Sequence, residues 1–193
     1  DRLASGDEST IGAGPMSMRR VVLFGTESTG KSALAAALAE HFGTAWAPEY
    51  VRAFWDQHDG HIQGSDLATI ARGQIANEET AAAAAEKVVF CDTDLLMNVR
   101  WADELFPGHC PDWVRTAADQ RSRAYALYLY CEPDLAWEAD PQRSFSDPAT
   151  WQDSALRCRQ MLHERQLPYA TVTGVGADRL EVAMAAVEAM LRA

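Results

Sequence analysis

The stretch that decides the fold is Gly25-Thr-Glu-Ser-Thr-Gly30-Lys31-Ser32. It fits the pattern G-x-x-x-x-G-K-[ST], follows the short apolar run 20–24 and opens the alanine- and leucine-rich segment 31–42. The two glycines allow successive backbone N–H groups to turn inward and bind an anion at a helix N-terminus. Lysine then reaches the β- and γ-phosphates, and the serine hydroxyl is a ligand for Mg²⁺. The motif therefore predicts a nucleoside-triphosphate site.

The expected nucleotide-binding residues form one continuous stretch: Gly25, Thr26, Glu27, Ser28, Thr29, Gly30, Lys31, Ser32 and Ala33. ATP is the expected phosphoryl donor and Mg²⁺ the expected metal. Switch GTPases, mechanical ATPases and small-molecule kinases all share this loop. Guanine-binding proteins usually carry an N-K-x-D segment, which this chain lacks, and large AAA+ machines need a longer chain. A compact kinase therefore fits a length of 193 residues best.

Strand patterns and helix patterns alternate along the rest of the chain. Short apolar runs predict strands over 20–24, 44–48, 88–91, 125–131 and 169–173. Apolar residues at helical spacing predict helices over 31–42, 66–86, 148–165 and 177–192. Such alternation predicts an α/β fold with a five-stranded parallel sheet and helices on both faces.

Composition and charge set further bounds. Hydrophobic residues make up 48% of the chain and the net charge is −11, so the strong positive field of a nucleic-acid or anionic-membrane binder is missing. The four cysteines show no paired spacing and predict reduced thiols in a cytoplasmic protein. Residues 1–17 have no hydrophobic period, so we expect a leader or a disordered extension there and a single kinase domain over 18–193.

Acidic residues follow the third predicted strand. Asp92 comes directly after four apolar residues, and ligands in open α/β sheets sit at such strand ends. We therefore predict that Asp92 and Ser32 hold the Mg²⁺ ion and its water shell. Asp94, two residues further on, can face the acceptor of the phosphoryl group. The alternative for both aspartates is to cap the helix that follows.

A second candidate constellation, Glu49-Tyr50-Val51-Arg52, follows the second predicted strand. A carboxylate at this edge can accept the proton of an acceptor hydroxyl, and a nearby arginine can bind the transferring phosphate. Glu49 is therefore the candidate general base. The alternative is a surface ion pair between Glu49 and Arg52 at a spacing of three residues.

Four stretches together resemble the ribosylnicotinamide kinase domain of NadR-type NAD-salvage proteins. These are GTESTGKS (25–32), EYVR (49–52), Gly73-Gln74 and CDTD (91–94), and the resemblance covers roughly 19–192. It implies an adenylate-kinase-like P-loop fold and ATP-dependent phosphorylation of the ribose 5′-hydroxyl of nicotinamide riboside. It also places Glu49, Tyr50 and Arg52 on the family's acceptor-side motif, Asp92 and Asp94 on its acidic pair, and Gln74 on a helix near the substrate.

A mobile lid is expected over 132–147, where charges and prolines follow the fourth predicted strand. The family often carries Asp-Gly-x-Arg there, whereas this chain has Asp140-Pro-Gln-Arg143, with a proline that stiffens the segment. Arg143 is the candidate residue of the lid whose positive charge stabilises the negative charge of the transition state. The alternative is that it is a solvated loop arginine. Trp101 and Trp137 could stack on a cationic pyridinium ring, although core packing is the commoner role.

Two other functions are compatible with these features. The chain could be a kinase for another nucleoside, nucleotide or small metabolite, or a P-loop ATPase that serves as a nucleotide-sensing regulatory module. A kinase needs charged residues around an acceptor pocket, whereas a nucleotide sensor does not. Whether Glu49, Arg52 and Asp94 converge on such a pocket therefore discriminates between a kinase and a sensor.

Overall fold

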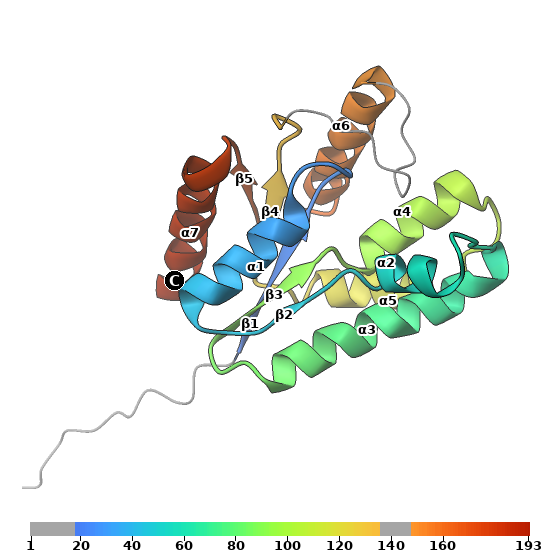
Figure 1. Ribbon diagram of the computed structural model, residues 1–193, viewed down its shortest axis with the longest axis horizontal. Helices are drawn as coiled ribbons and strands as arrows, with labels where there is room; N and C mark the ends of the chain where they lie inside the picture. The colour runs from blue at the N-terminus through green and yellow to red at the C-terminus, as the bar shows by residue number, and fades with distance from the viewer. Residues whose placement is uncertain (1–17, 136–147) are drawn as a thin grey trace, which may run out of the picture.

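The computed structural model describes residues 18–135 and 148–193 (Figure 1). Its strands are β1 (Arg19–Phe24), β2 (Trp46–Ala47), β3 (Val88–Asp92), β4 (Leu127–Cys131) and β5 (Tyr169–Val172). The helices are α1 (Lys31–Phe42), α2 (Tyr50–Gln57), α3 (Leu67–Ala83), α4 (Leu95–Leu105), α5 (Asp112–Ser122), α6 (Pro148–Glu164) and α7 (Gly176–Arg192), with a short 3₁₀ helix, η1 (Gly64–Asp66). The predicted leader and most of the predicted lid, including Trp137 and Arg143, lie outside the described residues.

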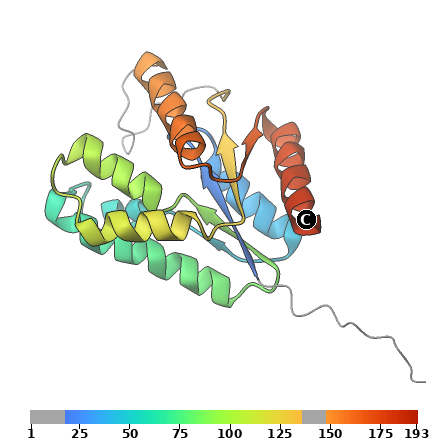
Figure 2. The ribbon, with the colours of Figure 1, turned by 180° about the vertical axis from the view of Figure 1, so that it is seen from behind.

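All five strands are parallel and lie in the order β2-β3-β1-β4-β5. Alternate residues of β1 supply the two hydrophobic layers. Val21 and Leu23 pack in the layer of α1 and α7, whereas Val22 and Phe24 pack in the layer of α3 to α6. Figures 1 and 2 show α1 and α7 together on one face of the sheet and the other helices grouped on the opposite face. The α/β fold with a five-stranded parallel sheet is thus confirmed.

Three helices are absent from the predicted pattern. The structure adds α2, α4 and α5, for which the apolar spacing predicts no range; α4 is the helix that Asp94 caps in the alternative given above for that residue. They are short and rich in charged residues; α2 buries Phe54, and α5 buries Val114 and Ala118. Helices of this length are stabilised mainly by packing against the rest of the protein, so local patterns predict them poorly. No helix in the described part of the chain is long and apolar enough to cross a membrane.

Candidate functional site

The phosphate-binding loop connects β1 to α1 and turns at two glycines with positive φ, 144° at Gly25 and 72° at Gly30. A Cβ atom at Gly25 would lie 2.9 Å from the carbonyl oxygen of Cys131, at the end of the neighbouring strand β4. Only glycine fits that close approach without a shift of the backbone. The Lys31 ammonium folds over the loop and donates a hydrogen bond to the Thr26 carbonyl oxygen at 2.7 Å.

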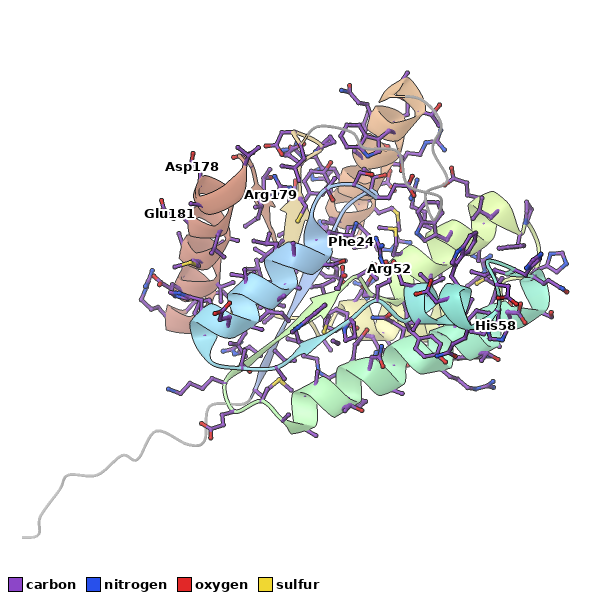
Figure 3. All side chains as sticks on the ribbon, in the orientation of Figure 1. Phe24, Arg52, His58, Asp178, Arg179 and Glu181 are labelled. Atoms are coloured by element: carbon purple, nitrogen blue, oxygen red, sulfur yellow. The ribbon has the colours of Figure 1, made fainter. Side chains whose placement is uncertain are left out.

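Side chains from distant helices hold the carbonyl groups of this loop. Arg179, on the first turn of α7 (Figure 3), donates to the Thr29 carbonyl oxygen at 2.9 Å. Trp151 of α6 donates to the Glu27 carbonyl oxygen at 2.6 Å. In a trans peptide the C=O and the following N–H point in opposite directions. These two hydrogen bonds fix the orientation of the Glu27–Ser28 and Thr29–Gly30 peptides, so the N–H group of each peptide points away from the helix that binds its carbonyl group.

The predicted metal-binding pair is in contact. Ser32 Oγ donates to Asp92 Oδ2 at 2.5 Å, and Asp92 is only 1% exposed. The other oxygen, Asp92 Oδ1, is buried and has no hydrogen-bond partner. A hydroxyl and an unpaired carboxylate oxygen suit Mg²⁺, which takes most of its remaining ligands from water and phosphates. The described residues contain no group of three or more His, Cys, Asp or Glu that could hold a metal ion by itself.

Glu49 lines a cavity beside α2. Its side chain is 14% exposed and its Oε2 accepts a hydrogen bond from Arg52 Nε at 3.1 Å. Burial raises the pKa of Glu49, and the negative charge of Asp92 raises it further, while Lys31 and Arg52 oppose the shift. Lys31 of the loop and Asp92, the residues predicted to bind phosphate and metal, therefore both act electrostatically on this carboxyl group, whose raised pKa suits the predicted general base.

The cavity has a volume of about 140 Å³ and lies among α2, α3, α4 and α5. Among the described residues that line it, Glu49 and Arg52 are charged, and Figure 3 shows Arg52 on α2. The remainder of the lining is mostly apolar and aromatic: Val51, Trp55, Ile62, Leu67, Ile70, Asn98, Trp101, Ala102, Leu105, Phe106, Cys110 and Val114. A cavity with one polar end and an apolar body suits a small molecule that carries an aromatic ring.

Three predicted acceptor-binding residues are absent from this lining. The Tyr50 ring packs on Gly73, and Gln74, 1% exposed, accepts a hydrogen bond from the Tyr50 backbone N–H at 3.0 Å. Asp94, also 1% exposed, caps α4 through the N–H groups of Leu96 and Met97 and accepts a hydrogen bond from the Tyr128 hydroxyl at 2.6 Å. This geometry favours the capping alternative for Asp94. The acceptor-side roles of these three residues stay predictions.

The sequence patterns do not single out Arg179 or Trp151, because neither belongs to a motif. Asn98, which lines the cavity, is missed for the same reason. No local signal in the sequence marks these residues, since their partners lie far away in the chain. Trp101 does line the cavity, as a residue that stacks on the acceptor would.

Comparison with known proteins gives the family. Residues 20–179 match the family of AAA domains. The chain belongs to this family. It is 30% identical over 162 residues to the trifunctional NAD biosynthesis/regulator protein NadR of Escherichia coli K12, and to the same degree to that of Salmonella typhimurium LT2. The matched region covers 82% of this chain but 39% of each relative, so the chain spans about two fifths of the length of these curated proteins.

Solved structures show the same fold. A NadR protein in complex with NR aligns over 91% of this chain and 52% of its own, with a TM-score of 0.70 and 18% identity. The deoxyadenosine kinase of M. mycoides with bound dATP aligns over 88% of this chain and 99% of its own, with a TM-score of 0.54 and 12% identity. The resemblance to NadR-type proteins is therefore confirmed: the chain is a P-loop domain homologous to part of NadR, with a fold that small-molecule kinases share.

Proposed function

We propose that the chain transfers the γ-phosphoryl group of ATP to the ribose 5′-hydroxyl of nicotinamide riboside. The observation that carries this proposal is the position of Glu49, which borders the cavity and lies within the electrostatic field of Lys31 and Asp92. A carboxylate so placed can meet both the acceptor hydroxyl and the phosphoryl group. The homology to NadR, of which a relative has been solved with NR bound, supports nicotinamide riboside as the acceptor.

Each residue of the site has its own role in the proposed reaction. The inward N–H groups of the loop and Lys31 bind the β- and γ-phosphates. Ser32 and Asp92 would hold Mg²⁺, which neutralises charge on the phosphate oxygens when bound. Glu49 orients the 5′-hydroxyl and accepts its proton as the new bond from O5′ to the γ-phosphorus forms. The bond from that phosphorus to the β–γ bridging oxygen breaks at the same time, and ADP leaves. Arg52 holds Glu49 in place and adds positive charge beside the transferring group.

The cavity lining also fits the acceptor. Trp55 and Trp101 both line the cavity, and aromatic rings attract the positive charge that a pyridinium ring carries. The net charge of −11 favours the approach of a cationic acceptor.

A coupled ADP-release assay tests the proposal. Nicotinamide riboside, the common nucleosides and the nucleoside monophosphates are compared as acceptors, and we expect nicotinamide riboside to have the highest kcat/KM. Glu49→Gln should lower kcat about 10²–10⁴-fold with little change in the KM of ATP. Glu188→Gln, which changes a half-exposed carboxylate on α7, is the matched control and should leave both constants unchanged.

Two other results of this assay would support the alternative functions. Preferential phosphorylation of another nucleoside or of a nucleotide would make the chain a kinase for that compound. Tight nucleotide binding with no phosphorylated acceptor would favour the nucleotide-sensing module.

A further inference from the structure

Helix α3 contains a glycine in its interior, which costs about 1 kcal/mol relative to alanine. The reason lies in the helix packed against it. A Cβ atom at Gly73 would fall 2.2–2.4 Å from three carbon atoms of the Tyr50 ring. The ring therefore lies directly on the α3 backbone, and no residue other than glycine leaves room for it there.

The next residue on α3 holds the backbone beside that ring. Gln74 Oε1 accepts a hydrogen bond from the Tyr50 backbone N–H at 3.0 Å. This N–H belongs to the first residue of α2 and has no partner within its own helix. One turn further along α3, Asn77 Nδ2 donates to the Pro48 carbonyl oxygen at 2.9 Å. The residues on both sides of Glu49 are thus held by side chains of α3.

A buried polar chain fixes the orientation of the Gln74 amide. Its Nε2 donates to Glu78 Oε1 at 3.4 Å, and Glu78 is fully buried. The second carboxylate oxygen of Glu78 accepts from Arg121 and from the Tyr125 hydroxyl, each at 2.7 Å. With its amide nitrogen committed to Glu78, Gln74 presents its oxygen to Tyr50.

The Glu49 side chain takes no part in capping its own helix. Glu49 occupies the N-cap position of α2, but its carboxylate makes no capping hydrogen bond; it accepts from Arg52 Nε and lines the cavity. Gln74 binds the Tyr50 N–H, the N–H of the first helical residue, which an N-cap side chain does not normally reach, so the start of α2 is held while Glu49 faces the cavity.

We propose that Gly73, Gln74 and Asn77, termed the α3 seat, are positioning residues that hold Glu49 at the reacting hydroxyl. The inference rests on the proposed function, in which Glu49 is the general base. It assigns Gln74 a role other than substrate contact, since neither Gly73 nor Gln74 lines the cavity.

Two variants of the α3 seat test the inference through kcat. Gln74→Met removes the acceptor for the Tyr50 N–H at similar size, and Gly73→Ala pushes on the Tyr50 ring. Each should lower kcat about 10-fold or more while the Kd of MgADP stays within twofold of the wild type, because misplacement of a reacting group by about 1 Å costs up to ~10²-fold. Thr80→Met, at an exposed position of α3, is the control and should change neither constant.

A double-mutant cycle isolates the contact between Gly73 and Tyr50. In a Tyr50→Ala background, Gly73→Ala has no ring to displace and should cause no further loss of kcat. Three results would overturn the α3 seat. The first is that the losses of kcat caused by Tyr50→Ala and Gly73→Ala are additive, and the second is a kcat within twofold of the wild type in both Gln74→Met and Gly73→Ala. The third is a loss of MgADP affinity in these variants as large as their loss of kcat.

Amide hydrogen exchange separates this inference from the proposed function. Exchange at the Tyr50 amide should be at least 10-fold faster in Gln74→Met than in the wild type, whereas exchange in α1 should be unchanged. This readout needs no acceptor. If the wild type phosphorylates no nicotinamide riboside but the Tyr50 amide responds as expected, the proposed function fails and the α3 seat stands. An unchanged Tyr50 amide overturns the α3 seat whatever the chain phosphorylates.

Discussion

Replacement of Arg179 by methionine should destabilise the protein and weaken nucleotide binding together. Arg179 is 4% exposed and donates to the carbonyl oxygens of Thr29, Gly174 and Glu132 at 2.9–3.0 Å, as well as to the Asp134 carboxylate. It thereby joins the phosphate-binding loop to the segments that follow β4 and β5. Methionine keeps the unbranched stem of the side chain and removes every one of these donors.

The size of the effect follows from what each partner loses. Thr29 is fully buried, so its carbonyl group would be left without a partner at a cost of about 1–3 kcal/mol. The carbonyl groups of Glu132 and Gly174 are half-buried and regain water, which limits their loss to about 1 kcal/mol in all. The Asp134 side chain is 35% exposed, and its ion pair adds little. A total of about 3 kcal/mol corresponds to a fall in Tm of ~6–12 °C for a domain of this size.

Thermal unfolding and calorimetric titration with MgADP measure the two effects. Without Arg179 the Thr29–Gly30 peptide can rotate, so the Gly30 N–H is no longer held toward the phosphates. We expect the Kd of MgADP to rise at least 10-fold, or about 1.4 kcal/mol. Arg192→Met is the matched control on the same helix; this arginine is 70% exposed, and its replacement should shift Tm by less than about 2 °C.

Two results would refute the reasoning. A Tm within 2 °C of the wild type would show that Arg179 does not hold the loop. A large fall in Tm with an unchanged Kd for MgADP would show that the residue supports the fold without orienting the phosphate-binding N–H groups.

Three further predictions concern single residues. Lys31→Ala should lower phosphoryl transfer by roughly 10³-fold or more with Tm nearly unchanged; near wild-type turnover in the coupled assay would contradict the loop assignment. Asp94→Ala should destabilise the protein by about 2–4 kcal/mol in chemical denaturation, through loss of the α4 cap and of the partner of the Tyr128 hydroxyl; a rise in acceptor KM at unchanged stability would instead support acceptor binding. The hydrogen bond from Arg20 lowers the pKa of Glu79 to about 2, so the carboxylate stabilises the folded chain above about pH 4.5 and loses this effect as the pH falls toward 2. Glu79→Gln should therefore lower Tm slightly at pH 7 and not at pH 2, and an equal difference at both pH values would refute the assignment.

Much of the fold and the nucleotide half of the site could be predicted because their signals are local. Gly25, Gly30, Lys31 and Ser32 act through the backbone conformation and side chains of one turn, so their spacing alone predicts an anion site. The three central strands β1, β3 and β4 carry apolar runs because strands inside a parallel sheet are buried on both faces. Asp92 follows one of these runs directly, and its contact with Ser32 follows from the way parallel strands end at a common edge.

The acceptor side depended on tertiary structure. Asp94 and Gln74 lie in motifs that suggest ligand contact, yet both side chains are buried. Asp94 caps α4, and Gln74 forms hydrogen bonds with Tyr50 of α2 and Glu78 of α3. Arg179 is 150 residues away from Thr29, whose carbonyl group it holds. A sequence determines which side chains can form hydrogen bonds, whereas the partners that they meet depend on which distant segments pack together. Local patterns therefore determined the sheet and the phosphate-binding loop, and only the packing of α2, α3 and α7 decided what orients them.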